Sequence, residues 1–334
     1  MRVVLLQLDG KLPNLALMRL AAHHKAQGDE VELRQARTPG AVERELGDDF
    51  GRVYASLIFE RTRSVVERLR QVYPGAIIGG TGWDLITTLE GHGVAEDTRP
   101  DYSLYPAFRQ SMGFTQRGCR LRCPFCVVPR KEGVVRQAAT IWDLWRGDGH
   151  SRELLLLDND FFGQPGWRER VRELREGKFK VSFNQGINAR MITPEAAEAI
   201  ASIDYRDDGM KVRRIYTAWD SRRDEERLFA GLRLLVAAGV RPDSIMVYML
   251  LGYWPGETED DWLYRQGRLR EFGARPYPMP FVRNHLTVGF QRWVVGAYDK
   301  RISWPEWKAA RCEPRKLKPR GRVSLPLFAE EKQD

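Results

Sequence analysis

Cysteine is scarce in this chain of 334 residues: there are four, and three of them, Cys119, Cys123 and Cys126, lie within one short segment. A disulfide framework would spread its cysteines along the chain, so this clustering excludes one and suits metal ligation in a reducing compartment. The fourth, Cys312, lies far away and is interpreted as a spare, partly buried thiol.

Long apolar runs are also lacking. No run approaches the roughly 20 residues that a membrane-spanning helix needs, so we expect no contact with a membrane. The opening segment Met1–Gly10 has neither the apolar core nor the cleavage site of a signal peptide. It is better interpreted as a buried first strand, and we expect a cytoplasmic protein.

Positive charge is in excess, with a net charge of +9. Such a surplus favours anionic partners such as nucleotides or nucleic acid. Because much of it is arginine, codon bias of the genome explains it equally well. The hydrophobic fraction of 43% is that of an ordinary globular protein, and the length allows two domains or one large barrel with an appendage.

Short apolar strands alternate with amphipathic helices in residues 1–100. This order predicts an α/β fold with a parallel, Rossmann-like sheet whose ligand crevice lies at the carboxyl ends of the strands. The loop Gly79–Gly82 follows one such strand; its glycines either let a ligand approach the backbone or simply form a turn. The expected strands are Arg2–Leu8, Glu30–Leu33, Arg52–Phe59 and Ala76–Ile78, and the expected helices are Asn14–Gln27 and Ser64–Tyr73.

The alternation resumes after a linker at Glu96–Phe108. Six strands, each followed by a loop and a helix, predict a partial (βα)₆ barrel over residues 101–289, with the chemistry in the loops after the strands. Residues 290–334 are expected to form a short helical and basic C-terminal extension. The expected strands are Ser111–Gln116, Leu154–Asp158, Lys180–Asn184, Arg213–Ala218, Ser244–Leu250 and Pro278–Val282, and the expected helices include Trp167–Glu176, Pro194–Ala201, Glu225–Ala238 and Thr258–Phe272.

The three clustered cysteines have the spacing C-x₃-C-x₂-C and follow the predicted strand Ser111–Gln116. Three thiolates on one loop can bind three irons of a cubane cluster and leave the fourth iron open to a cofactor or substrate. A structural zinc site would need four closed ligands, and no second cysteine pair or close histidine pair accompanies these three. Zinc is therefore the weaker interpretation.

This segment resembles the signature of the radical S-adenosylmethionine (SAM) superfamily, with Phe125 in the place of its aromatic residue. The resemblance implies that Cys119, Cys123 and Cys126 hold a 4Fe–4S cluster whose open iron binds SAM. Reductive cleavage of SAM would give methionine and a 5′-deoxyadenosyl radical, with flavodoxin or ferredoxin as the reductant. Isomerisation, methyl transfer and sulfur insertion are all open as the step after hydrogen abstraction.

The same resemblance assigns the ends of later strands to SAM. Asp158 and Asn159, within the segment Leu157–Asp160, would contact its amino group, although they suit a helix N-cap equally well. Arg190 would pair with its carboxylate beside Asn184 and Gln185. Asp220 would bind the ribose and Leu250 would pack on the adenine, with a plain core position as the alternative for Leu250.

Residues 1–100 resemble the cobalamin-binding Rossmann-like domain that precedes some radical SAM barrels, on the strand–helix order, Ser56-Leu57 and Gly79-Gly80. Cobalamin is therefore a candidate cofactor, but Asp9–Asn14 lacks the histidine of the cobalt-binding motif, and the domain would then serve as a substrate platform. The chain also resembles a radical SAM group associated with bacteriophages and mobile elements, which favours nucleotide modification or action on a nucleic-acid base. The alternatives are a cobalamin-dependent methyltransferase and a non-catalytic, metal-containing nucleic-acid-binding protein.

Near the C terminus, Ser324–Phe328 resembles the short apolar peptides that dock on the bacterial DNA sliding clamp. Such a segment also packs commonly on its own domain. Clamp binding is therefore kept as a hypothesis about a partner.

Overall fold

The first four strands form one parallel sheet in the order β2-β1-β3-β4. The computed structural model describes residues 1–45 and 47–311. The strands are β1 (Arg2–Gln7), β2 (Glu30–Gln35), β3 (Arg52–Ser56) and β4 (Ile77–Gly79). All four lie where the sequence predicts them.

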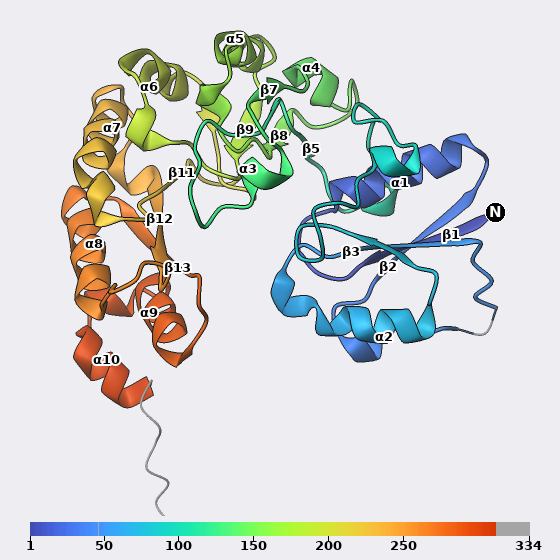
Figure 1. Cartoon of the computed structure of the whole chain (residues 1–334). Coiled ribbons are helices and arrows are strands. Elements are labelled where there is room, and N and C mark those ends of the chain that lie inside the picture. Colours follow the sequence, from blue (N-terminus) through green and yellow to red (C-terminus); the bar gives the residue numbers. More distant parts are fainter. Residues whose placement is uncertain (46, 312–334) are drawn as a thin grey trace, which may run out of the picture.

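Helices α1 (Leu15–Ala26) and α2 (Ser64–Val72) cover opposite faces of this sheet (Figure 1). Successive side chains of a strand point to opposite faces. Val3 and Leu5 of β1 accordingly pack with α1, whereas Val4 and Leu6 pack with α2. A strand buried on both faces needs a continuous apolar run, which explains the segment Val3–Leu6.

Apart from the short pair β6 and β7, the remaining strands are all parallel and divide between two sheets. One has the order β10-β9-β8-β5, and the other has the order β11-β12-β13. The Ile187 N–H, after β9, donates to the Tyr216 carbonyl of β11 at 2.8 Å and so links the two sheets. The bounds are β5 (Ser111–Gly113), β8 (Glu153–Leu156), β9 (Lys180–Phe183), β10 (Asp204–Tyr205), β11 (Ile215–Ala218), β12 (Ile245–Leu251) and β13 (Arg275–Pro280).

The six predicted strands of this region are present, and the α/β class is confirmed. The expectation that Ser111–Gln116 is one strand is wrong, because β5 ends at Gly113 and Gln116 belongs to a separate antiparallel pair, β6 (Gln116–Arg117) with β7 (Arg136–Gln137). The two-residue strand β10, which occupies the edge of β9, was not predicted.

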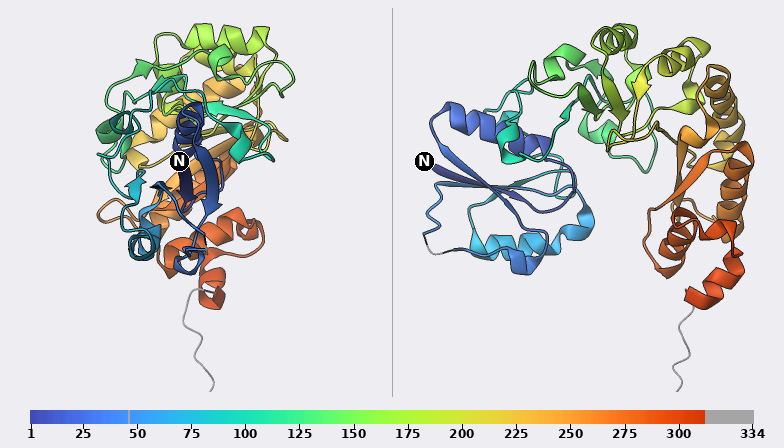
Figure 2. Two further views of the ribbon diagram at one scale, coloured as in Figure 1. Left: turned by 90° about the vertical axis from the view of Figure 1, so that its right-hand side faces the viewer. Right: turned by 180° about the vertical axis from the view of Figure 1, so that it is seen from behind.

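The helices from α4 to α8 follow one another along the outside of an arc formed by these two sheets, whereas α3 belongs to the loop between β6 and β7 (Figures 1 and 2). Val247 and Met249 of β12 are fully buried with them, while the alternate residues Tyr248 and Leu250 are half-buried on the opposite, inner face. The helices are α3 (Val128–Lys131), α4 (Ile141–Leu144), α5 (Trp167–Glu176), α6 (Pro194–Ala201), α7 (Glu225–Ala237), α8 (Glu259–Phe272), α9 (His285–Val295) and α10 (Trp304–Arg311).

Local signals account for where these helices begin. Thr193 caps α6 through the Ala196 N–H, and Pro194 occupies the first turn, as predicted. Thr258 and Asp261 form a capping box at the start of α8. Helix α9 runs across residue 289, the expected end of the barrel region, and α9 and α10 contribute aromatic residues to the same core as β11 and β12.

The first sheet is joined to the second through α1. Met18 of α1 packs with Met112 of β5 and Leu155 of β8 in one buried cluster. In the linker, the Tyr105 hydroxyl donates to Gln7 Oε1 at 3.0 Å and accepts from the Asn14 N–H at 3.2 Å. The inner face of β5 and β8 is therefore covered by α1 and the linker. Residues 1–100 are called the first unit below.

Within residues 1–45 and 47–311, no helix is long and apolar enough to cross a membrane. Cys312 and the segment Ser324–Phe328 lie outside the described residues.

Candidate functional site

The cysteines lie on a loop that closes on itself. Gln116 and Arg117 pair with Gln137 and Arg136 in the β6–β7 ladder, so the loop begins and ends at one place. Gly118 has a φ of +75°, and a Cβ there would overlap the carbonyl of Val134. Both the backbone conformation and the contact therefore require glycine directly before Cys119.

The buried carboxylate of Glu132 stabilises the closed loop. Glu132, whose side chain is 6% exposed, accepts from Arg117 Nε and Nη2, both at 3.1 Å. It also accepts from the Gly118 N–H at 3.1 Å and from Asn159 Nδ2, at the end of β8, at 3.0 Å. Glu132 thus joins the start of the loop to its end and fixes both to the central sheet.

The three thiols are free and half-buried, and Cys123 and Cys126 lie near enough to Cys119 to affect its pKa. Cys123 and Cys126 share a turn, because the Cys126 N–H donates to the Cys123 carbonyl at 3.0 Å. Burial raises the pKa of the Cys119 thiol to about 11, and the negative charges of Asp160, Cys123 and Cys126 add to this rise. Metal binding would therefore release protons from these thiols.

The donor set of the cysteine loop is three thiols, which a 4Fe–4S cluster with one open iron can use. Among the described residues, no three or more His, Cys, Asp or Glu side chains are arranged to hold one metal ion. In a cubane each thiolate binds a different iron, so its ligands do not converge on one point. Three thiols without an accompanying imidazole also lack the fourth ligand of a structural zinc site.

Arg190 brings positive charge to Cys123. It lies on the short helix η6 (Ala189–Met191) after β9 and donates to the Cys123 sulfur. Its Nη1 donates to Asp224 Oδ2 at 2.7 Å, and its Nε donates to Asn188 Oδ1 at 3.2 Å. Burial raises the pKa of Cys123, and the Arg190 guanidinium opposes that rise.

Asp220, after β11, lies close enough to Cys123 to affect its pKa. The backbone N–H of Leu250 donates to the Asp220 carboxylate, and Arg190 and Arg265 act on it with positive charge. Burial nevertheless raises the pKa of Asp220 to about 6. The structure therefore places Arg190 and Asp220 beside Cys123, and the backbone of Leu250 beside Asp220.

Phe125 attaches the loop to the end of β12. Its ring packs edge-on against Tyr253, with centroids 5.3 Å apart, and against Trp254 at 6.5 Å. The indole N–H of Trp254 donates to the Asp220 carbonyl at 2.7 Å. Phe125 thus packs against the same tryptophan that binds the backbone of Asp220.

Arg265, which the sequence did not single out, fixes the ends of β11 and β12. It is almost fully buried and donates to the carbonyls of Trp219 and Leu250, both at 2.9 Å. It also forms an ion pair with Glu257, which in turn accepts from the Gly252 N–H at 2.6 Å. Nothing in the spacing of the sequence indicates that Arg265 makes these contacts.

The segment Leu157–Asp160 is occupied by contacts within the chain. The Asp158 carboxylate is buried and accepts from the Thr115 N–H at 2.7 Å, the Thr115 hydroxyl and the Gln116 N–H at 3.3 Å. Asp160 forms a two-point ion pair with Arg120 at 2.6 and 3.1 Å. Asp160 is the N-cap residue of η5 (Phe161–Gly163), but its side chain makes no capping bond. These residues hold the cysteine loop against β8.

Asn184 and Gln185 lie one strand further along. Asn184 Nδ2 donates to Asp208 Oδ2 at 2.8 Å, and Gln185 Nε2 donates to Asn184 Oδ1 at 2.7 Å. Gln185 is exposed. Asp208, Glu132 and the tyrosines of β11–β13 were missed at the sequence level; the one available signal for Glu132 is an acid inside an arginine-rich loop.

The glycines after β4 are explained by packing within the first unit. A Cβ at Gly80 would overlap Leu57, and one at Gly82 would overlap Phe59. Asp9 accepts from the N–H groups of Ile58 and Phe59 at 2.9 and 2.8 Å, so the loop after β1 is bonded to the loop after β3. These glycines accommodate the chain's own backbone.

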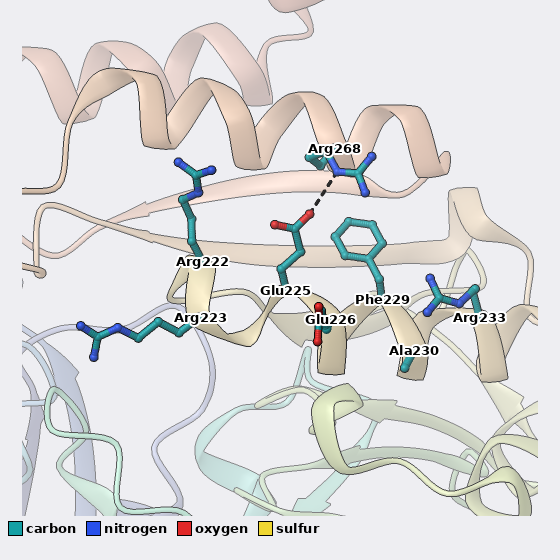
Figure 3. A pocket seen from close by; sticks show the side chains of 8 residues that line it. All are labelled: Arg222, Arg223, Glu225, Glu226, Phe229, Ala230, Arg233 and Arg268. Atoms are coloured by element: carbon teal, nitrogen blue, oxygen red, sulfur yellow. Dashed lines mark hydrogen bonds and ion pairs between the residues drawn. The ribbon is translucent and has the colours of Figure 1, made fainter.

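A depression of about 830 Å³ lies on the outer surface of α7 and α8 (Figure 3). Arg268 donates to Glu225 there at 3.1 Å, and Arg222 donates to Asp261 at 3.1 Å. The cysteine-loop residues do not line it, and its paired charges give no reason to place the chemistry there.

Comparison of the chain with models of known protein families and with curated proteins finds no match, so the site is interpreted from its own geometry.

Proposed function

We propose that this protein is a radical SAM enzyme in which Cys119, Cys123 and Cys126 hold a 4Fe–4S cluster. The observation that carries the proposal is the closed loop that carries three thiols, one of which, Cys123, lies beside Arg190 and Asp220. When bound, the cluster would supply the electron that cleaves SAM to methionine and a 5′-deoxyadenosyl radical for hydrogen abstraction. We further propose that β5, β8, β9, β11, β12 and β13 act together as a partial (βα)₆ barrel.

The chain's own residues would bind and orient SAM. Arg190 is anchored by Asp224 and Asn188, so its guanidinium is fixed beside Cys123, where it would pair with the methionine carboxylate. Asp220 would accept from the ribose hydroxyls, and Leu250 would pack on the adenine from the inner face of β12. Asp158 is left out of this assignment because its oxygens already accept three bonds from Thr115 and Gln116.

The first unit is proposed as a substrate platform. Lys131 Nζ, in the cysteine loop, donates to Thr81 Oγ1 at 2.7 Å, so the loop after β4 contacts the cysteine loop. Gly80 and Gly82 accommodate the backbone of Leu57 and Phe59, and no step of the proposal needs cobalamin. A nucleotide or nucleic-acid base is the proposed substrate class, and flavodoxin or ferredoxin the proposed electron donor in a cytoplasmic setting.

Anaerobic reconstitution tests the proposal. Protein supplied with iron, sulfide, dithionite and SAM should release 5′-deoxyadenosine, and Cys123→Ala should abolish the release. Cys312→Ala serves as the matched control and should retain it. An intact cluster without SAM cleavage would favour a metal-containing nucleic-acid-binding protein, and bound zinc in place of iron would overturn the proposal.

A further inference from the structure

Three tyrosines form a row across the inner face of β11, β12 and β13. The rings of Tyr216 and Tyr248 are parallel within 2°, with centroids 5.7 Å apart. Tyr277 is the register partner of Tyr248, and its ring lies edge-on at 5.6 Å. Tyr248 and Tyr277 are half-buried, and the tyrosine row belongs to none of the hydrophobic clusters of the described residues.

This composition is unusual for a parallel sheet. Parallel strands are commonly covered on both faces and carry aliphatic side chains on both. Here the outer face of β12 follows that rule with Val247 and Met249, whereas the inner face places Tyr248 between Met246 and Leu250. Tyrosine combines a flat apolar ring with a polar group, as expected of a surface that contacts a ligand.

A fixed carboxylate lies beside the tyrosine row. Asp208 Oδ1 accepts from the Ser182 hydroxyl at 2.6 Å, and Oδ2 accepts from Asn184 Nδ2 at 2.8 Å. Each oxygen of an ionised carboxylate can accept about two hydrogen bonds, so each keeps acceptor capacity for a further donor. Asp208 is half-buried, and the two bonds fix its orientation.

Although the whole chain has a net positive charge, the group that acts most on the tyrosine row after burial is acidic or phenolic. Burial, and after it the negative charge of Asp208, raises the pKa of Tyr216 to about 12. For Tyr248, burial, the Tyr216 phenol and Asp208 act in the same direction and raise its pKa. Arg214, the cation that acts on Tyr216, donates to the Asp243 carbonyl at 2.9 Å.

We propose that the tyrosine row and Asp208 bind the planar ring of the substrate, and that the ring carries two adjacent N–H donors, as guanine does. A carboxylate with one free acceptor position on each oxygen suits such a pair of donors. Stacking on an aromatic side chain adds affinity for any base, so the tyrosines would bind the ring and Asp208 would select it. This inference rests on the proposed function for its catalytic meaning, but the binding itself needs neither cluster nor SAM.

Binding of free nucleosides to the full chain tests the inference, measured by calorimetry with and without the reconstituted cluster. Guanosine should bind at least tenfold more tightly than adenosine, which lacks the adjacent N–H pair, and inosine, which lacks the exocyclic amine, should fall between them. Asp208→Asn should remove the preference, whereas Asp148→Asn, an exposed acid elsewhere, should leave it unchanged. Tyr248→Phe should keep guanosine binding, and Tyr248→Leu should weaken it at least tenfold.

Three results would overturn the inference. The first two are equal affinity for guanosine and adenosine and an unchanged preference in Asp208→Asn. The third is tighter binding of N-acetylarginine amide, whose guanidinium also carries adjacent N–H donors, than of guanosine. Should Asp208→Asn fail to fold, the Tyr248 pair of variants still decides the matter. SAM cleavage is scored separately, so a protein that cleaves SAM but does not bind guanosine refutes this inference alone. A protein that binds guanosine but never cleaves SAM refutes the proposed function alone.

Discussion

The backbone N–H of Gly118 donates to the Glu132 carboxylate at 3.1 Å. This bond joins the residue before the first cysteine to a residue beyond the third. Asn159 reaches the same carboxylate from the end of β8 at 3.0 Å. The spacing of the cysteines in space therefore depends on a side chain outside the cysteine motif.

Glu132→Gln should reduce iron incorporation without removing any thiol. The change removes the nearer of the two carboxylates that pair with Arg117, the other being Glu96 at 3.8 Å, and we expect the free energy of unfolding to fall by about 2 kcal/mol. Iron and sulfide per chain after reconstitution, with urea unfolding in parallel, measure both effects. Glu198→Gln on the exposed side of α6 is the control. Wild-type iron content in Glu132→Gln would show that the carboxylate does not organise the loop.

Gly118→Ala should be far more damaging than Gly133→Ala. Both glycines have positive φ, at +75° and +72°, so both substitutions cost about 1 kcal/mol of backbone strain. Only at 118 would the new methyl group also overlap backbone, at Val134, whereas nothing lies within 4 Å of the position at Gly133. Iron content should fall sharply in the first variant alone. Equal loss in both would mean that strain, and not the closure of the loop, is what matters.

Arg190→Lys should weaken SAM binding while leaving the cluster in place. Lysine keeps the positive charge but cannot make the two-point contact that guanidinium makes with a carboxylate. We expect a SAM dissociation constant raised about tenfold or more, measured by equilibrium dialysis, with unchanged iron content. Arg206→Lys is the control, since Arg206 pairs with Asp204 at 2.6 Å at the edge of the sheet. Undiminished SAM affinity in Arg190→Lys would remove Arg190 from the binding site.

Asp158 should make stability depend on pH. Burial raises the pKa of its carboxyl from 3.8 to about 7, so the folded state holds this proton over a range in which the unfolded chain has lost it. The stabilisation is therefore complete below pH 4 and declines as pH rises to about 7, by up to about 4 kcal/mol. Urea unfolding at pH 5 and pH 7.5 should show this decline in the wild type and a flatter response in Asp158→Asn. Identical slopes would place the pKa of Asp158 near its ordinary value.

The order of the elements was predictable because it depends on periodicity within short segments. The first strand and the helix Trp167–Glu176 depend on neighbouring residues, and the structure has them where the sequence predicts them. The clustering of Cys119, Cys123 and Cys126 is also plain in the sequence, since one loop carries all three. The partners of these elements were less evident: β10 was not foreseen, because a two-residue strand has no periodicity to detect.

The sequence by itself determined most of the strands and helices and the three neighbouring thiols, because each arises from residues close together in the chain. Only the tertiary structure decided that Asp158 accepts hydrogen bonds from Thr115, that Glu132 closes the cysteine loop, and that Tyr216, Tyr248 and Tyr277 lie together near Asp208. These relationships join residues from different strands and loops. They follow from which strands become neighbours in a sheet, and that choice leaves no mark in the local pattern of any one of them.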